Sequence, residues 1–386
     1  QRIVMTKRDV AISLAVVGDL SFEGPRADRP ASKWFTAVAP AFRETDLAIG
    51  NLESPLVEGG TAIPGKCTLR GTTKWAAVLR EAGIGLVTLA NNHTMDYGET
   101  GLRSTIAALE KEGLQYVGAG LDIASACAPV LLDVRGVRVA CLGRTIVPVS
   151  PPIGAGRTKP GVAFLDRDET VASLRRCRRD ADLVLLLLHW GLEQYRHPSP
   201  AQRRLARDLV QAGADAIVGH HPHVTQGFER IGSAVVAYSL GNFIFSGFEW
   251  EYLQENGTPV KTTFVLSEEN RKGLVLEVSG SAHRSLALRL QPTRMHPDDG
   301  VQLDIGATRS EEMQALSSAL ERKSYRLWWY AYAIRREWAL RIGRTLSPRR
   351  LVTKWHRLRL RHLGELLVSL RRSTKIVSER STNPYE

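Results

Sequence analysis

Hydrophobic and polar positions alternate in blocks along this chain, and the clearest block covers residues 182–223. It opens with six consecutive apolar residues, 183–188, which are too few for a free-standing helix and indicate a strand buried on both faces. Apolar residues at helical spacing follow within 198–213, and a second short strand is predicted at 216–218. The block predicts a βαβ unit in which each strand runs into a histidine.

The same alternation of strands and amphipathic helices recurs along most of the chain. We expect further strands at 9–17, 46–49, 84–89, 115–120, 129–142 and 234–240. We expect further helices at 34–42, 74–82, 98–113 and 171–179. Alternating runs at 260–266, 273–279 and 285–290 predict antiparallel strands that close the fold. Strands that alternate with helices are typical of an α/β protein.

One stretch is rich in proline and glycine, residues 148–162. It predicts a long surface loop or lid rather than a domain linker, because the alternation of strands and helices resumes after it. We therefore predict one large α/β domain over residues 9–300. A helical tail is predicted over 311–386, and Pro348 is expected to divide it into two helices.

The tail carries the positive charge of the chain. The formal net charge is +12, but residues 322–386 hold 17 Lys and Arg against 4 Asp and Glu, whereas residues 1–321 hold 35 against 36. The tail also contains Trp328, Trp329, Trp338 and Trp355. This composition favours surface helices that pack an aromatic side on the main domain, and it leaves peripheral contact with an anionic membrane or polymer open. Without a recognisable DNA- or RNA-binding motif, nucleic acid is not expected as a partner.

Cysteine content and hydropathy indicate the cellular compartment. The four cysteines, Cys67, Cys127, Cys141 and Cys177, include no CxxC pair, which fits reduced thiols better than disulfides or a zinc-cysteine site. No apolar run approaches the roughly 20 residues that cross a bilayer. The first ten residues lack the apolar segment of a signal peptide. We therefore expect a cytoplasmic or peripheral membrane protein, although an upstream signal or anchor stays open.

Polar side chains that can bind metals follow five of the predicted strands: Asp19; Asn51 with Glu53; Asn92 with His93; His189; and His221 with His223. A single histidine or aspartate at such a position is most often structural. Five together are harder to explain that way, because the carboxyl ends of parallel strands meet at one sheet edge. Carboxylates, an amide and imidazoles suit Mn, Fe or Zn, and two ions can share a bridging carboxylate.

Six motifs in order, GDLSF, NLESPL, ANNHTMDYG, HWGLEQ, GHHPHV and YSLGNFIF, resemble those of the CapA-type poly-γ-glutamate capsule-biosynthesis proteins. That family lies within the calcineurin-like metallophosphoesterase superfamily. The similarity covers roughly residues 11–290 and excludes the basic tail. The resemblance implies a four-layer α/β/β/α sandwich with a metal centre at the ends of the strands.

The resemblance also implies roles for individual residues. Asp19 and Glu53 would be carboxylate ligands, with Glu53 in place of the bridging aspartate. A second ion would be held by Asn92, His189 and His221, while His223 would bind the first. The implied catalytic residues are His93 near the leaving group, Asp96 to orient it, and Glu193 as a hydrogen-bond acceptor from substrate or a base.

Two positions depart from the phosphoesterase pattern. Ser21 stands where that pattern has a histidine, so the first ion would lose an imidazole. Thr94 stands where it has the acidic partner of the catalytic histidine. A centre with one tight and one weak ion therefore stays open. The additional histidine of the GHHPHV run, His220, is expected to be structural.

Three functional hypotheses follow. The first is a metal-dependent hydrolase or synthesis factor that acts on poly-γ-glutamate or a related anionic cell-surface polymer; the polymer rests on the resemblance alone. The second is a phosphomonoesterase or phosphodiesterase with a small or lipid-linked substrate. The third is a protein without enzymatic activity that binds a polymer or membrane during assembly. A divalent ion with a general acid can hydrolyse either a phosphoester or an amide, so the residues alone do not choose between these bonds.

Overall fold

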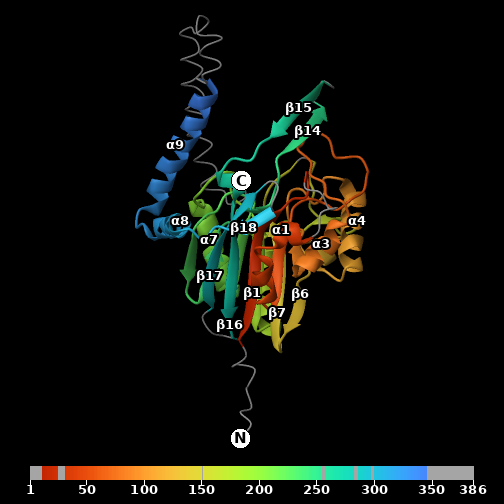
Figure 1. Ribbon diagram of the computed structural model, residues 1–386. Helices are drawn as coiled ribbons and strands as arrows, with labels where there is room; N and C mark the ends of the chain where they lie inside the picture. The colour runs from red at the N-terminus through yellow and green to blue at the C-terminus, as the bar shows by residue number, and fades with distance from the viewer. Residues whose placement is uncertain are drawn as a thin grey trace, which may run out of the picture.

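The computed structural model describes residues 11–24, 31–149, 151–253, 258–281, 286–296 and 300–345 (Figure 1). Its helices are α1 (Ala31–Phe35), α2 (Ala39–Arg43), α3 (Trp75–Ala82), α4 (Gly98–Lys111), α5 (Ile123–Cys127), α6 (Arg167–Asp180), α7 (Pro200–Gln211), α8 (Ala307–Ser318) and α9 (Tyr325–Thr345), with 3₁₀ turns η1 (Glu269–Arg271) and η2 (Ala319–Glu321). Its strands are β1 (Ile12–Leu20), β2 (Leu47–Leu52), β3 (Ile84–Thr88), β4 (Gln115–Val117), β5 (Ala119–Gly120), β6 (Val130–Val134), β7 (Val137–Thr145), β8 (Gly161–Val162), β9 (Leu183–His189), β10 (Ala216–His220), β11 (Phe228–Ile231), β12 (Ala234–Ala237), β13 (Asn242–Ile244), β14 (Phe248–Leu253), β15 (Pro259–Phe264), β16 (Lys272–Gly280), β17 (Ala287–His296) and β18 (Gly300–Leu303).

Two sheets make up the body of the protein. The first has the order β18-β17-β16-β1-β2-β3-β4, and β13 also pairs with β1. Strands β1 to β4 are parallel, whereas β16 and β17 extend the sheet in antiparallel fashion, as the alternating runs at 273–279 and 285–290 predict. The second sheet has the order β11-β12-β10-β9-β7-β6. Its centre is the predicted βαβ unit, β9, α7 and β10, with the two strands parallel.

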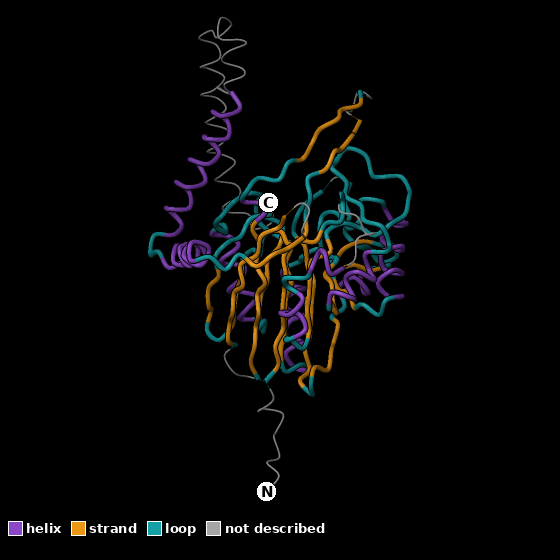
Figure 2. Tube along the Cα trace, viewed as in Figure 1, coloured by secondary structure: helices purple, strands orange, loops and turns teal. Residues whose placement is uncertain are grey.

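The sheets pack face to face between two layers of helices, and Figure 2 shows the strands gathered in the middle of the molecule. The period-2 pattern of β9 explains the packing. Leu183, Leu185 and Leu187 join the core between the sheets, while the residues that alternate with them join the core under α6 and α7. Helices α1 to α4 cover the outer face of the first sheet through residues such as Trp75 and Leu102. The predicted α/β/β/α sandwich is confirmed.

The boundaries of several elements differ from the prediction for local reasons. The expected helix at 34–42 is divided into α1 and α2, because Pro40 lies at the beginning of α2, a position that proline favours. The expected strand at 129–142 is a hairpin of β6 and β7. Its turn residues, Arg135 and Gly136, have φ of 53° and 84°, which is the backbone that a tight two-residue hairpin turn requires. Among the described residues, the run at 260–266 pairs through β15 with β14 and with no other strand, and β14 and β15 form an arm that projects beyond the sheets (Figure 1).

The stretch at 148–162 is anchored to the body of the protein over its described residues. Ile153 is buried in the core that underlies α1 to α4. The last residues of the 148–162 stretch form β8, which pairs antiparallel with β5. The four cysteines, all within the described ranges, form no disulfide.

Helix α9 connects the tail to the second sheet. Trp329 and Ala333 are completely buried in the core under α7, while Leu327 on the other face is 73% exposed. Tyr325, Trp329 and Arg336 donate hydrogen bonds to the backbone carbonyls of residues 198, 197 and 194, respectively. Pro348, Trp355 and the second predicted tail helix lie outside the described residues. Among the helices that are described, none is long and apolar enough to cross a membrane.

Candidate metal centre

The polar strand ends gather between the two sheets rather than at the edge of one. Asp19 belongs to β1 and Glu53 directly follows β2, both in the first sheet. His189 ends β9 and His220 ends β10, both in the second sheet, and His221 and His223 follow in the next turn. The expectation of a single edge is therefore wrong. Parallel strands of both sheets end on the same side of the sandwich, so each sheet contributes half of the site.

Glu53 is the most unusual group in this cluster. Its side chain is completely buried, and neither carboxylate oxygen has a hydrogen-bond partner within the part of the chain that the structure describes. Its Oε1 lies 3.6 Å from His223 Nε2 and 3.9 Å from His189 Nε2. Burial raises the pKa of Glu53 well above its ordinary value, and the carboxylate of Asp19 adds to the increase against the opposing effect of His223. A buried carboxylate without a hydrogen bond is costly unless a cation binds it.

Asp19 is equally buried but well supported. Its Oδ1 accepts a hydrogen bond of 2.9 Å from Asn51 Nδ2, and its Oδ2 accepts one of 3.3 Å from the His221 backbone amide. Desolvation would raise the pKa of Asp19, but the imidazoles of His220 and His223 outweigh it and hold the pKa well below its usual range. Close packing fixes the strand here, since a Cβ on Gly18 would lie 2.0 Å from the Gly241 carbonyl oxygen.

The rings of His189, His221 and His223 lie side by side near these carboxylates, and His220 Nδ1 lies 3.3 Å from Asp19 Oδ1. The ring centres of His189 and His221 lie 4.8 Å apart, and those of His221 and His223 lie 5.8 Å apart. His189 Nε2 lies 2.7 Å from Asn92 Oδ1, so the structure brings together the amide and imidazole that were predicted to share an ion. His221 and His223 have φ of 94° and 56°, which non-glycine residues adopt only where the surroundings hold them.

The protonation of the histidines differs with position. Burial lowers the pKa of His221 to about 4 and also lowers that of His189, so both are neutral imidazoles, the form that binds metals. Burial would lower the pKa of His223 as well, but Glu53 and Asp19 together raise it to about 10.

Ligand atoms of Asp19, Glu53 and His223 all lie within 4.8 Å of one another, as do those of Glu193, His221 and His223. Glu193 is exposed at the mouth of the cluster, unlike the other acids. Desolvation raises the pKa of Glu193, but His221 and His223 outweigh it and leave the pKa below its ordinary value. Atoms bound to one ion at about 2.0–2.2 Å lie about 3–4 Å apart. The separations of 3.2 Å between His223 Nδ1 and Asp19 Oδ2 and of 3.6 Å between His223 Nε2 and Glu53 Oε1 fall in this range, and the donor chemistry suits a divalent cation.

His93 lies beside the cluster and is held by Asp96. His93 Nδ1 lies 2.7 Å from Asp96 Oδ2, which also accepts a 2.6 Å hydrogen bond from the Leu69 amide. The carboxylate that the phosphoesterase pattern has at the next residue is therefore supplied three residues after His93. Thr94 instead donates a 2.5 Å hydrogen bond to the Leu89 carbonyl and supports the turn. Nδ1 of His93 is occupied, which leaves Nε2 available for a substrate.

Lys66 and Asn242 were given no role by the sequence analysis, and Asn51 was named only as a polar group at a strand end. Lys66 forms an ion pair with Asp96 and donates a 2.6 Å hydrogen bond to the Asn92 carbonyl. Asn51 bridges Asp19 and His189, and Asn242 Oδ1 lies 2.9 Å from His223 Nδ1. Asn51 and Asn242 lie within quoted motifs, so their positions were a usable signal. Lys66 lies in an irregular loop with no periodicity to mark it, and Ser21 is completely buried at the end of β1.

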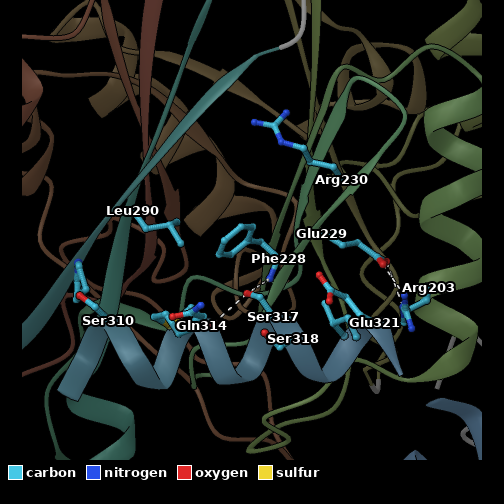
Figure 3. Close-up of a pocket in the computed structure, with 13 residues that line it drawn as sticks. Arg203, Phe228, Glu229, Arg230, Leu290, Ser310, Gln314, Ser317, Ser318 and Glu321 are labelled. Atoms are coloured by element: carbon cyan, nitrogen blue, oxygen red, sulfur yellow. Dashed lines mark hydrogen bonds and ion pairs between the residues drawn. The ribbon is translucent and has the colours of Figure 1, made fainter. Parts of the chain in front are cut away.

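A separate pocket of about 710 Å³ lies between α8, β11 and β17, away from the metal-binding cluster (Figure 3). Two of its charged side chains, Arg203 and Arg230, already have hydrogen-bond partners. Arg203 donates a 3.1 Å hydrogen bond to Glu229, and Arg230 donates one of 2.7 Å to the carbonyl of residue 286. The Ser317 hydroxyl accepts from the Phe228 amide at 3.1 Å and so fixes α8 on the strand. This pocket contains none of the predicted site residues.

Comparison with known proteins agrees with the motifs. The family described as "Bacterial capsule synthesis protein PGA_cap" matches residues 13–247. The chain is 34% identical over 271 residues to "PGA biosynthesis protein CapA" of Bacillus subtilis, which covers 66% of this chain and 71% of that protein. It is 36% identical over 243 residues to "Capsule biosynthesis protein CapA" of Bacillus anthracis, which covers 58% of this chain and 59%, less than two thirds, of that protein. A solved putative 5'-nucleotidase from Staphylococcus aureus is a distant resemblance, with 13% identity and a TM-score of 0.44 over 81% of this chain and 58% of that one.

Proposed function

The chain belongs to the PGA_cap family of bacterial capsule synthesis proteins, and from that membership and the buried cluster we propose that it is a metal-dependent hydrolase. The proposed ligands are Asp19, Glu53, Asn92, His189, His221 and His223. The ion is Mn, Fe or Zn, with one or two ions bound, because mixed oxygen and imidazole donors suit these metals.

The observation that carries the proposal is the state of Glu53. A fully buried carboxylate without a hydrogen bond, close to two imidazoles and a second buried carboxylate, has no evident structural purpose. Folding tolerates such a group where a ligand compensates it. A divalent ion is the ligand that this donor set favours.

The protein's own groups divide the remaining work. When bound, a divalent ion makes water a better nucleophile near neutral pH and polarises the bond under attack. His93, oriented by Asp96 through Nδ1, donates a proton to the leaving group from Nε2 when its ring is protonated on both nitrogens. Burial lowers the pKa of His93, and the Asp96 carboxylate opposes this by stabilising the protonated ring. Lys66 holds Asp96 in place, and the Lys66 bond to the Asn92 carbonyl links His93 to the ligand cluster. Glu193 at the mouth accepts a hydrogen bond from substrate or acts as a base.

The proposed substrate is poly-γ-glutamate or a related anionic cell-surface polymer. The names of the two Bacillus relatives, which refer to PGA and capsule biosynthesis, support this class. Hydrolysis of an amide bond and hydrolysis of a phosphoester bond both need an activated nucleophile and a proton donor such as His93. A phosphomonoester or phosphodiester is therefore the alternative substrate.

The exposed face of α9 supports a second part of the proposal, which concerns membrane contact. α9 carries the exposed side chains of Arg326 and Arg335 together with those of Leu327 and Trp338. A helix with basic residues and exposed apolar side chains suits the surface of an anionic membrane. We propose peripheral membrane contact through this helix, close to the site of polymer synthesis.

The test compares hydrolysis by protein reconstituted with Mn²⁺, Fe²⁺ or Zn²⁺ with hydrolysis by chelator-treated protein. Substrates are γ-linked glutamate oligomers and a panel of phosphomonoesters and phosphodiesters. We expect metal-dependent turnover of one class, lost in Glu53→Gln and kept in the control Glu99→Gln, whose side chain is exposed and pairs with Arg103. Binding of the oligomers without turnover of any substrate would contradict the hydrolase and favour an assembly protein.

A further inference from the structure

Helix α9 holds the loop that carries Glu193. This loop covers residues 190–199, between β9 and α7, and has no regular secondary structure. Five consecutive loop residues each share a hydrogen bond with α9. The pairs are Gln194 with Arg336, Tyr195 with Glu337, Arg196 with Tyr332, His197 with Trp329 and Pro198 with Tyr325. Helix positions 325, 329, 332 and 336 are spaced by three or four residues, so one face of α9 makes these contacts.

Gln194 connects α9 to the turn that carries the metal-binding histidines. On one side, Arg336 Nε donates a 3.0 Å hydrogen bond to the Gln194 carbonyl. On the other side, the Gln194 amide donates one of 2.8 Å to the Pro222 carbonyl. The side-chain oxygen of Gln194 accepts a 3.0 Å hydrogen bond from Asn270, which also donates one of 2.8 Å to the His223 carbonyl. A single residue therefore joins the helix to the backbone on which the histidines lie.

The backbone near Glu193 is left-handed at two positions, with φ of 95° at Gly191 and 64° at Gln194. A residue other than glycine keeps such a conformation only where its surroundings hold it. Arg336 supplies part of that hold, since its guanidinium also lies 4.4 Å from the centre of the Tyr195 ring. The Glu193 side chain is exposed, so the direction of this backbone, rather than side-chain packing, decides where the carboxylate lies.

Arg336 contributes little to the burial of α9 itself. The helix is buried through Trp329 and Ala333, whereas Arg336 is only partly buried. It also lies outside the family match, which ends at residue 247. We infer that Arg336 is a positioning residue, which fixes the Glu193 carboxylate at the mouth of the metal-binding cluster through the backbone of Gln194. This inference rests on the role proposed above for Glu193, as a hydrogen-bond acceptor from substrate or a base.

The test is a double-mutant cycle of Arg336→Met and Glu193→Gln, which measures kcat/KM per mole of bound metal for the substrate class that the wild type hydrolyses. Methionine keeps an apolar stem and removes the guanidinium. In the wild-type background Arg336→Met should lower kcat/KM by about 10- to 100-fold, up to the loss that a displacement of about 1 Å causes. In the Glu193→Gln background the same change should lower kcat/KM by less than about 2-fold, because the group that Arg336 positions is already absent. The control Arg335→Met, on the exposed face of the same helix, should leave kcat/KM unchanged in both backgrounds.

Hydrogen exchange measured by mass spectrometry follows the loop independently of activity. Exchange in residues 190–199 should be faster in Arg336→Met than in Arg335→Met, because the loop has lost its bond to the helix. Exchange in β9 should stay the same, which shows that the variant is folded. If Arg336→Met fails that check, Arg336→Lys takes its place in the cycle, since lysine keeps the charge but lacks the planar guanidinium.

The outcomes separate this inference from the proposed function. A wild type without metal-dependent turnover of any substrate refutes the hydrolase, and the role of Arg336 falls with it. An active wild type in which Arg336→Met matches Arg335→Met, in exchange or in kcat/KM, overturns the inference about Arg336 alone. An equal loss of kcat/KM in the wild-type and Glu193→Gln backgrounds overturns it too, since that result would mean that Arg336 acts on the fold and not through Glu193.

Discussion

Glu53→Gln is predicted to change the stability of the protein in opposite directions with and without metal. In the metal-free protein the Glu53 carboxylate is completely buried and unsatisfied, so a neutral amide of the same shape relieves part of the desolvation cost. That relief is about 1–3 kcal/mol, the cost of one unsatisfied buried group. In excess metal the difference in stability reverses, and the wild type becomes more stable than Glu53→Gln. An ion at 100 times its dissociation constant stabilises the wild type by about 2.7 kcal/mol, and the variant loses most of this gain.

The assay is thermal unfolding followed by circular dichroism, in chelator and in excess Zn²⁺ or Mn²⁺. In chelator we expect Glu53→Gln to unfold a few degrees above the wild type, since 1 kcal/mol shifts the midpoint by about 2–4 °C in a domain of 150–250 residues and by somewhat less in this larger one. In excess metal we expect the wild type to unfold at the higher temperature. Glu99→Gln should move the midpoint little in either condition, because its exposed ion pair contributes at most about 0.5 kcal/mol.

The reasoning would be refuted by a variant that is less stable than the wild type in chelator and gains as much stability as the wild type from added metal. That result would mean that Glu53 stabilises the fold through its own contacts and takes no part in binding a cation.

Three further predictions concern the neighbouring groups. Asp96→Asn should lower kcat by about 10²–10⁴-fold with unchanged metal content, because the neutral amide no longer stabilises the doubly protonated ring from which His93 donates; an unchanged kcat would remove His93 from the mechanism. Trp329→Ala should lower the free energy of unfolding by about 3–5 kcal/mol, because the ring is fully buried, whereas Trp338→Ala, at a side chain that is 40% exposed, should cost far less in the same denaturant titration. Burial lowers the pKa of His197 to about 4, so folding favours its neutral form, and stability should fall by up to about 3 kcal/mol as the pH drops from 6.5 towards 4. Replacing His197 with Asn should flatten the dependence over that window, and a parallel pH profile would contradict this.

The layers of the fold follow from short-range patterns. The period-2 burial of β9 and the helical spacing of α7 are visible in the sequence because each depends only on which face a residue presents. The assignment of strands to one sheet or two is not visible, since it depends on long-range pairing of β1 with β16 and of β7 with β9. This is why one sheet edge was expected where two sheets meet.

Some residues of the site can likewise be found from the sequence, and others cannot. Residues at strand ends are marked by their position, and the structure brings Asp19, Glu53 and His223 into one cluster. Lys66 carries no such mark, because only the folded loop places it against Asp96. The case of His220 is different again. Its place in the GHHPHV run is apparent from the sequence, but the approach of its Nδ1 to within 3.3 Å of Asp19 Oδ1 becomes apparent only from the packed structure.

The most direct test of the central claim is the metal content of untagged protein measured by plasma mass spectrometry, with Glu53→Ala and His221→Ala for comparison. A metal centre between the sheets predicts one or two equivalents of Mn, Fe or Zn in the wild type and their loss in both variants. Wild-type protein that holds no metal even after reconstitution, or variants that retain the full content, would contradict it.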